Sequence, residues 1–200
     1  GERALDCFDR MKCESLTPNA VTFTGALKAC RSLGVIRKGQ QIHEEVMRTG
    51  FLLNNVMLGN ALVDMYAGCN ELRKAQLVLD ELPVRDEVSW NSLIAGYAQE
   101  GQGYEALNCF MEMEREGLSP DEVSFICILN ACAHSGILDE AQMYYEIMNI
   151  RYGITPRLEH HTCMVVVFGC AGLFDKAMSV IKTVPSSNDP SAWIALLGAC

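Results

Sequence analysis

The stretch from Glu87 to Asp121, EVSWNSLIAGYAQEGQGYEALNCFMEMEREGLSPD, predicts how the rest of the chain folds. Its apolar residues recur at steps of three and four positions, which is the spacing of two amphipathic helices ending near Gly101 and Gly117. Such a helical hairpin buries too little apolar surface to be stable alone, so we expect neighbours built on the same plan. The residues expected to face inward from its first helix are Val88, Trp90, Leu93, Ile94 and Tyr97.

An internal repeat indicates that such neighbours exist. Residues 1–19 align with residues 103–121, and the aligned pairs include Phe8 with Phe110. We therefore predict one continuous solenoid segment over residues 1–200. Its units are a partial unit 1–19, then 20–55, 56–86, 87–121, 122–157 and 158–189, and a partial unit 190–200. Further residues expected to face inward are Val21, Phe23, Ala26 and Leu27 in the second unit and Trp193, Leu196 and Leu197 in the last.

The composition is that of a chain with a continuous core. Half of the residues are hydrophobic, 20% are charged and six are proline, which argues against disorder. No apolar run approaches the roughly 18 residues that a membrane-spanning helix needs, so we expect no membrane insertion. The ten cysteines include no Cys-x-x-Cys pair, and several recur at equivalent repeat positions. We interpret them as small core residues of a protein from a reducing compartment.

Several stretches resemble a known family. Asn60 to Tyr66 (NALVDMY), Trp90 to Ile94 (WNSLI) and Tyr152 to Pro156 (YGITP), with the order of long, short and standard units, resemble the pentatricopeptide repeat proteins of plant organelles. Residues 128–200 are similar to the last long and short units and the first extension motif of the subclass with mixed repeat lengths, the PLS subclass. The resemblance implies an all-α fold, a right-handed α-solenoid superhelix of tandem helix-turn-helix repeats.

The resemblance also implies that the chain binds single-stranded RNA, with one unit facing one base. In the family the fifth and last residues of a unit read the base edge, and the second residues of adjacent units clamp the faces of the base. An amide or a hydroxyl can hydrogen-bond a base edge, and an aliphatic side chain offers it a dry contact. The residues assigned to base reading are Asn60, Asp86, Asn91, Asp121, Thr162, Asp189, Thr24 and Asn55. The residues assigned to base clamping are Met57, Val88 and Val123.

The identity of these residues implies a preferred base for most units. By the family pattern, 56–86 and 87–121 favour uracil, 158–189 favours guanine and 20–55 favours adenine, whereas 122–157 has no readable pair. A purely structural role competes with this interpretation for the aspartates, because an aspartate directly before a helix is a common N-cap. Capping does not explain Asn60 and Asn91, which are expected inside first helices, where asparagine lowers helix propensity.

The charge of the chain leaves a second function open. Nucleic-acid binding depends on Lys and Arg neutralising phosphates, yet the formal net charge is −9. The alternative is a helical-repeat scaffold that holds protein partners within an organellar ribonucleoprotein complex. The more specific expectation is a recognition factor for cytidine-to-uridine RNA editing in a mitochondrion or chloroplast, which is what the resemblance implies.

No constellation of residues indicates catalysis, a metal or a cofactor. His43-Glu44-Glu45 contains the His-x-Glu spacing of zinc deaminases, but no Cys-x-x-Cys completes the ligand set, so we interpret it as an exposed helix turn. We interpret His160-His161 as a solvated helix start. A deaminase domain, which the PLS subclass often carries, would lie beyond Cys200.

Overall fold

The computed structural model describes residues 1–183 and 190–199, and within these the chain is all helical. Twelve α-helices and one short 3-10 helix are found there, and no strand. The contacts between Cα atoms divide the chain into two compact units, Gly1–Gly96 and Tyr97–Cys200. None of the described helices is long and apolar enough to cross a membrane.

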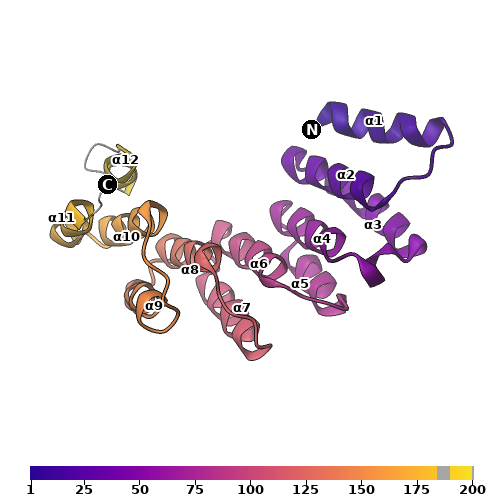
Figure 1. Cartoon of the computed structure of the whole chain (residues 1–200). Coiled ribbons are helices and arrows are strands. Elements are labelled where there is room, and N and C mark those ends of the chain that lie inside the picture. Colours follow the sequence, from indigo (N-terminus) through magenta and orange to yellow (C-terminus); the bar gives the residue numbers. More distant parts are fainter. Residues whose placement is uncertain (184–189, 200) are drawn as a thin grey trace. The chain divides into compact units, whose positions relative to one another are not determined.

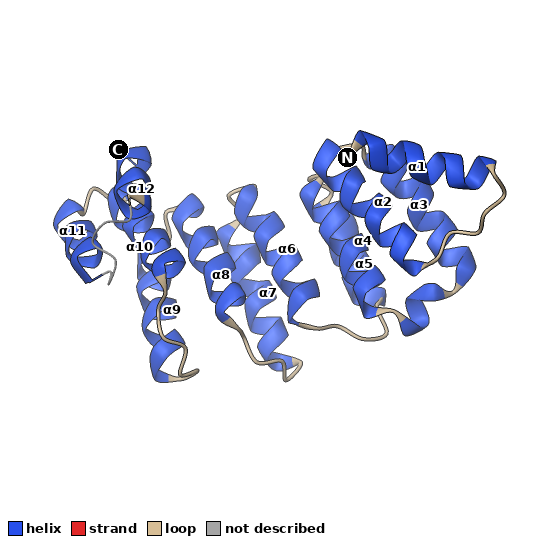
Figure 2. Ribbon diagram, turned by 45° about the horizontal axis from the view of Figure 1, so that its top comes forward, coloured by secondary structure: helices blue, strands red, loops and turns tan. Residues whose placement is uncertain are grey.

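The first unit is a stack of helical hairpins. Its helices are α1 (Glu2–Cys13), α2 (Ala20–Leu33), α3 (Ile36–Thr49), the 3-10 helix η1 (Phe51–Asn54), α4 (Val56–Gly68) and α5 (Leu72–Glu81), and α6 (Glu87–Gln99) runs across the division (Figure 1). The first helices of successive hairpins, α2 and α4, pack side by side, with α3 against α2 and α5 against α4 (Figure 2). The stack therefore exposes one side made of first helices.

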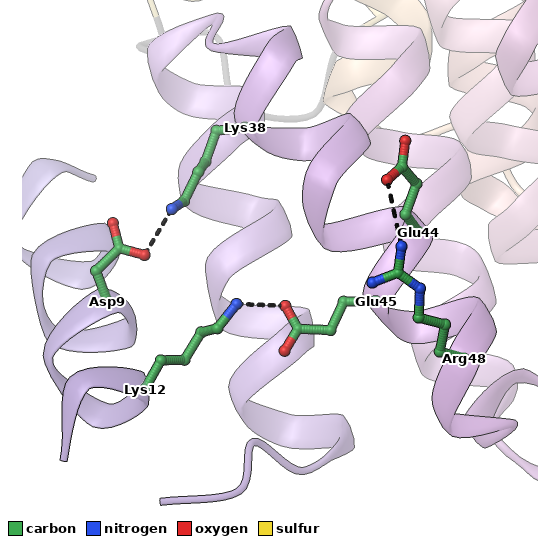
Figure 3. Close-up of polar contacts among 6 residues, drawn as sticks. All are labelled: Asp9, Lys12, Lys38, Glu44, Glu45 and Arg48. Carbon is green, nitrogen blue, oxygen red and sulfur yellow. Dashed lines mark hydrogen bonds and ion pairs between the residues drawn. The ribbon is translucent and has the colours of Figure 1, made fainter. Parts of the chain in front are cut away.

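The second helices of the first unit are joined by charged side chains. Lys12 on α1 pairs with Glu45 on α3 at 2.6 Å, and Lys38 on α3 pairs with Asp9 on α1 at 2.5 Å (Figure 3). Both pairs are partly exposed, so each contributes little to the free energy of unfolding. Through these pairs the ammonium groups of Lys12 and Lys38 are already bound to carboxylates of the neighbouring helix.

The second unit repeats the arrangement. It contains α7 (Gly103–Arg115), α8 (Glu122–Ser135), α9 (Leu138–Ile150), α10 (Leu158–Cys170), α11 (Phe174–Thr183) and α12 (Ser191–Ala199). Helices α8, α10 and α12 contact one another in that order, and α7, α9 and α11 pack against them. The predicted all-α fold of tandem hairpins is confirmed.

Glycines end the helices where the sequence predicts. Gly34 follows α2 with a φ of 65°, and Gly136 follows α8 with a φ of 68°. Residues with a side chain seldom adopt this left-handed conformation. The turn lets the next amide donate back into the helix, from Val35 N to Cys30 O and from Ile137 N to Cys132 O, both at 3.0 Å.

Aromatic pairs join two of the hairpins to the next, one pair in each unit. Phe8 on α1 meets Phe23 on α2 with ring centroids 5.8 Å apart, and Phe110 on α7 meets Phe125 on α8 at 5.5 Å. All four side chains are buried. The interplanar angles of 56° and 62° are those of tilted and edge-to-face contacts, which aromatic rings prefer. The repeat seen in the sequence is therefore a repeated packing contact.

Four residues expected to face inward are instead exposed. Val21 and Val88, in the first turns of α2 and α6, are 77% and 57% exposed. A helix turns by about 100° per residue, so Val88 points roughly 200° away from Trp90, which is buried. Trp193 and Leu197 on α12 are 45% and 75% exposed, although α12 packs against α10 and α11.

We predict that Phe110→Ala lowers the free energy of unfolding by about 3–5 kcal/mol, because it leaves a cavity between α7 and α8. The measurement is urea unfolding followed by circular dichroism. Phe174→Ala is the matched control, since that ring is 48% exposed on α11 and should lose far less. Equal losses in the two variants would contradict the proposed packing role of the aromatic pair.

Candidate functional site

A groove on the first-helix side of the first unit contains residues predicted to bind a base. It encloses about 450 Å³ between α2, α4 and the beginning of α6. Helix α6 packs closely on α5 because Gly96 has no side chain; a Cβ there would lie 2.8 Å from Leu72 Cδ2. The lining includes five of the residues assigned from the sequence: Thr24, Met57, Asn60, Asp86 and Val88.

Asn60 and Asp86 form the polar centre of this groove. Asn60 is 8% exposed, and its Nδ2 donates to both carboxylate oxygens of Asp86 at 3.0 Å. Asp86 also caps α6, since its Oδ1 accepts from Ser89 N at 2.9 Å and its own N–H donates to Ser89 Oγ at 3.1 Å. Capping and groove lining are therefore not alternatives, because one carboxylate does both. Asn60 Oδ1 is buried and has no hydrogen-bond partner.

The second residue of each of four predicted hairpins is aliphatic and exposed. Met57 and Val88, at the mouth of the groove, are 70% and 57% exposed. Val21 in the same unit is 77% exposed, and Val123 in the second unit is 51% exposed. An exposed apolar side chain that recurs at one repeat position indicates a contact surface rather than chance exposure. Met57, Val88 and Val123 thus remain accessible for contact with a ligand.

The threonines assigned to base reading direct their protons into their own helices. Thr24 Oγ1 donates to Ala20 O, and Thr162 Oγ1 donates to Leu158 O, both at 2.8 Å. Each hydroxyl therefore keeps only acceptor capacity for a ligand. The residue paired with Thr162 in the prediction, Asp189, lies outside the described residues.

Asn55, the predicted partner of Thr24, does not line this groove. Asn55 caps α4 by accepting from Leu58 N at 2.9 Å and lines hollows separate from the groove that holds Thr24. Asn91 is 7% exposed in the first unit. Asp121 belongs to the second unit, where its Oδ1 accepts from Ser124 N at 2.8 Å and caps α8.

Three polar residues of the groove were missed by the sequence reasoning. Lys28 and Ser92 each lie four residues after a predicted contact position, and so does Asp64 after Asn60. Four residues make about one helical turn, so these side chains share the face of the predicted ones. Helical spacing counted from each predicted residue could have found them.

Comparisons with known proteins agree with this architecture. The profile of the PPR repeat family matches residues 85–134, and that of the PPR repeat matches residues 123–151. A pentatricopeptide repeat-containing protein of Arabidopsis thaliana is 38% identical over 199 residues, which is 100% of this chain and 25% of the relative. The chain belongs to the pentatricopeptide repeat family. A second Arabidopsis thaliana relative, whose name places it in the mitochondrion, is 39% identical over 98% of the chain and 28% of its own length.

Solved structures show the same fold as this pentatricopeptide repeat chain. The pentatricopeptide repeat protein PPR10, in complex with an 18-nt psaJ RNA element, matches 92% of the chain with a TM-score of 0.77 and 24% identity, over 28% of its own chain. The PPR domain of the Arabidopsis thaliana protein-only RNase P 1, in complex with tRNA, matches 86% of the chain and 94% of its own with a TM-score of 0.63 and 16% identity. These likenesses establish an α-solenoid of pentatricopeptide repeats.

The two histidines at the start of α10 are buried, not solvated as predicted. His160 is 0% exposed; Arg157 N donates to its Nδ1 at 3.1 Å, and its Nε2 lies 3.0 Å from Glu122 O. His161 is 8% exposed, and its Nδ1 lies 2.8 Å from the hydroxyl of Tyr145. The start of this pentatricopeptide helix packs between α8 and α9, which a single-sequence pattern does not show.

His43 is half-buried, whereas Glu44 beside it is exposed as predicted for this helix turn. Its Nδ1 lies 3.0 Å from the hydroxyl of Tyr66, and the two rings meet edge to face with centroids 5.6 Å apart. Burial lowers the pKa of His43, while the negative charges of Glu81 and Glu44 raise it. Among the described residues no group of three or more His, Cys, Asp or Glu side chains could hold a metal ion.

We predict that protonation of His161 destabilises the repeat. Burial, and next the neighbouring His160, lower the pKa of His161 from the ordinary value of 6.5, so the unfolded chain binds this proton more readily. The stabilisation is complete above pH 6.5 and is lost as the pH falls toward the folded pKa. Urea unfolding measured at several pH values between about 5.5 and 7.5 covers the window in which histidine titrates.

Two variants separate this effect from general acid sensitivity. His161→Gln should flatten the dependence of unfolding free energy on pH across that window. His134→Gln is the control substitution, because His134 is exposed on α8. An identical pH slope in wild type and His161→Gln would refute the assignment.

Proposed function

We propose that this chain binds single-stranded RNA through its first helices, with one base facing each hairpin. The observation that carries the proposal is the groove at Asn60, where a buried acceptor without a partner lies between two exposed aliphatic side chains, Met57 and Val88. Relatives of the same fold support it, since structures of PPR10 and of the RNase P 1 domain contain RNA. Base stacking on side chains and hydrogen bonds to splayed bases are the usual means of reading single strands.

The hydrogen bonds of Asn60 favour uracil in this groove. The amide Nδ2 already donates to Asp86, and the atom of Asn60 without a partner is its acceptor, Oδ1. A buried unsatisfied acceptor costs about 1–3 kcal/mol, and a donor on the base edge would remove this cost. The N3–H of uracil is such a donor, and the faces of the ring would contact Met57 and Val88.

The other units follow the same proposal with the unit boundaries predicted from the sequence. Asn91 and Asp121 would read uracil, with Val88 and Val123 as the clamp, and Thr162 with Asp189 would read guanine. Thr24 and Asn55 would read adenine. Unit 122–157 reads no base, because its fifth residue is apolar and its last is a cation.

In the cell the chain would act in RNA maturation. The chain spans between 25% and 32% of the length of the curated relatives it matches, so the activity of the whole protein is also a proposal. We infer that it is a PLS-type recognition factor for cytidine-to-uridine editing in a plant organelle, and the mitochondrial name of one relative supports that compartment. The deaminase chemistry would be supplied by another domain or by another protein.

A protein scaffold is the second candidate function, and one pocket favours it. This pocket of about 240 Å³ lies between α3, η1 and α5, on the opposite side of the hairpins from the groove. Its lining includes Val46, Met47, Leu53 and Val78, of which Met47 and Leu53 are 54% and 70% exposed. Such an apolar surface suits a protein partner, and the net charge of −9 disfavours nucleic acid.

We predict that Asn60→Thr changes base preference from uracil to guanine. Threonine already occupies the equivalent positions 24 and 162, where its hydroxyl donates to the helix backbone. In this variant the Asp86 carboxylate loses the hydrogen bonds from the Asn60 amide. It would then be free to accept hydrogen bonds from the two N–H groups on the edge of guanine. Fluorescence anisotropy with RNAs that carry each base at the matched position, in both chain directions, should show a change of about 1–3 kcal/mol in relative affinity.

Base preference is the informative readout, because loss of stability weakens all RNAs alike. Thr22→Ser is the matched control, since Thr22 belongs to the N-terminal capping box of α2 and does not line the groove. It should leave the preference unchanged. Equal affinity of the wild type for matched and scrambled RNA would instead favour the scaffold.

A further inference from the structure

We propose that Lys28 binds a backbone phosphate of the nucleotide whose base occupies the groove at Asn60. The proposal rests on the RNA-binding function proposed above and adds the cation that holds the strand. Lys28 lines this groove, and its side chain is exposed on α2. Phosphate neutralisation by Lys or Arg is the main source of affinity for nucleic acids, so a groove without a cation would bind RNA poorly.

Lys28 stands out among the first helices of the hairpins. The described helices α2, α4, α6, α8 and α10 contain two Lys or Arg residues in total, Lys28 and Arg31, both on α2. Arg31 is already engaged, with its Nε 3.1 Å from Asp64 Oδ1. Within the part of the chain that the structure describes, Lys28 forms no ion pair or hydrogen bond.

The remaining polar groups of the groove offer acceptors to a ligand. The hydroxyls of Thr24 and Ser92 donate to the backbone oxygens of Ala20 and Val88 at 2.8 and 2.9 Å. The amide of Asn60 donates to a carboxylate. The two hydroxyls therefore have no proton left for a phosphate oxygen, and Lys28 is the cationic donor among the side chains lining this groove.

The negative charge nearest to Lys28 along the groove is already paired with another cation. Asp64 also lines the groove, and its negative charge is compensated by Arg31. Burial raises the pKa of Asp64, and the positive charges of Arg31 and then Lys28 lower it, which places all three charges in one neighbourhood. With Arg31 and Asp64 paired, Lys28 and the Asp86 carboxylate are the remaining charged groups of the groove lining. The Asp86 carboxylate accepts from Asn60, whereas Lys28 keeps its charge for a ligand.

The position of Lys28 along its helix matches that of a phosphate. The proposed base contacts, Met57, Asn60 and Val88, lie in the first turns of α4 and α6. Lys28 lies one turn further along α2 than Thr24, about 6 Å along the helix axis. A base whose reading edge faces Asn60 and Asp86 directs its ribose and phosphate away from these two residues, and Lys28 lines the same groove without contacting either of them.

The other cations on α1 and α3 serve a different face. Lys12 and Lys38 bridge the second helices α1 and α3, where Figure 3 shows them directed at Glu45 and Asp9. Neither of them lines the groove. Lys38 is therefore a matched control for Lys28, because its removal changes the net charge of the chain equally.

The test compares Lys28→Met, Lys28→Arg and Lys38→Met with the wild type, using fluorescein-labelled single-stranded RNA with A-U-U-N-G in either direction. Affinity is measured by anisotropy over salt concentrations from about 50 to about 200 mM. We expect Lys28→Met to reduce the slope of log K against log salt by about 0.7, which corresponds to about fivefold weaker binding at about 0.1 M salt. Lys28→Arg and Lys38→Met should keep the wild-type slope.

Each other outcome overturns a specific claim. An unchanged slope in Lys28→Met, with wild-type binding intact, would overturn the phosphate contact and leave the proposed RNA binding standing. A loss that depends on base identity with an unchanged slope would assign Lys28 to the base and also overturn the proposal. Failure of the wild type to bind RNA even at the lowest salt would overturn the proposed function itself. Thermal melting of Lys28→Met should match the wild type, since this side chain is exposed.

Discussion

The structure depends on the contact between the second helix of one hairpin and the first helix of the next. Phe8 with Phe23, and Phe110 with Phe125, make this contact in the two units with nearly the same centroid distance. A single hairpin cannot bury its apolar faces, so each one is stable only with neighbours on both sides. Stacking by these rings sets the spacing of the first helices and therefore the spacing of everything those helices present.

This stacking also decides which side chains are free for function. The middle of each first helix is covered by its neighbours, whereas the second residue of the helix remains exposed, as Met57 and Val88 do. Asp86, the N-cap residue of α6, completes the groove. Its carboxylate accepts hydrogen bonds from the backbone N–H of Ser89 at the start of α6 and from the side-chain amide of Asn60. A residue needed for stability is thereby placed beside the ligand, so a variant of Asp86 would combine a folding defect with a binding defect.

The negative charge of the chain is unevenly distributed among the helices. Several carboxylates of the second unit lie on the second helices α7 and α9, among them Glu105, Glu112, Glu114, Asp139, Glu140 and Glu146. The groove of the first unit has a different balance, since its two carboxylates, Asp64 and Asp86, are accompanied by the cations Arg31 and Lys28. Net charge alone is therefore a poor guide to the partner of a solenoid, because each surface presents its own set of groups.

The sequence by itself determined the helices, their glycine ends and the repeat, because these depend on local spacing and backbone conformation; α6 and α7 end at Gln99 and Arg115, close to the predicted glycines. It also identified Asn60 and Asp86 as partners in one unit. Only the tertiary structure decided which faces are covered. Val88 is exposed and His160 is buried, against prediction, because burial depends on how closely the neighbouring helix packs. The hydrogen bond from Asn60 to Asp86, across 26 residues, exists only once α4 and α6 are stacked.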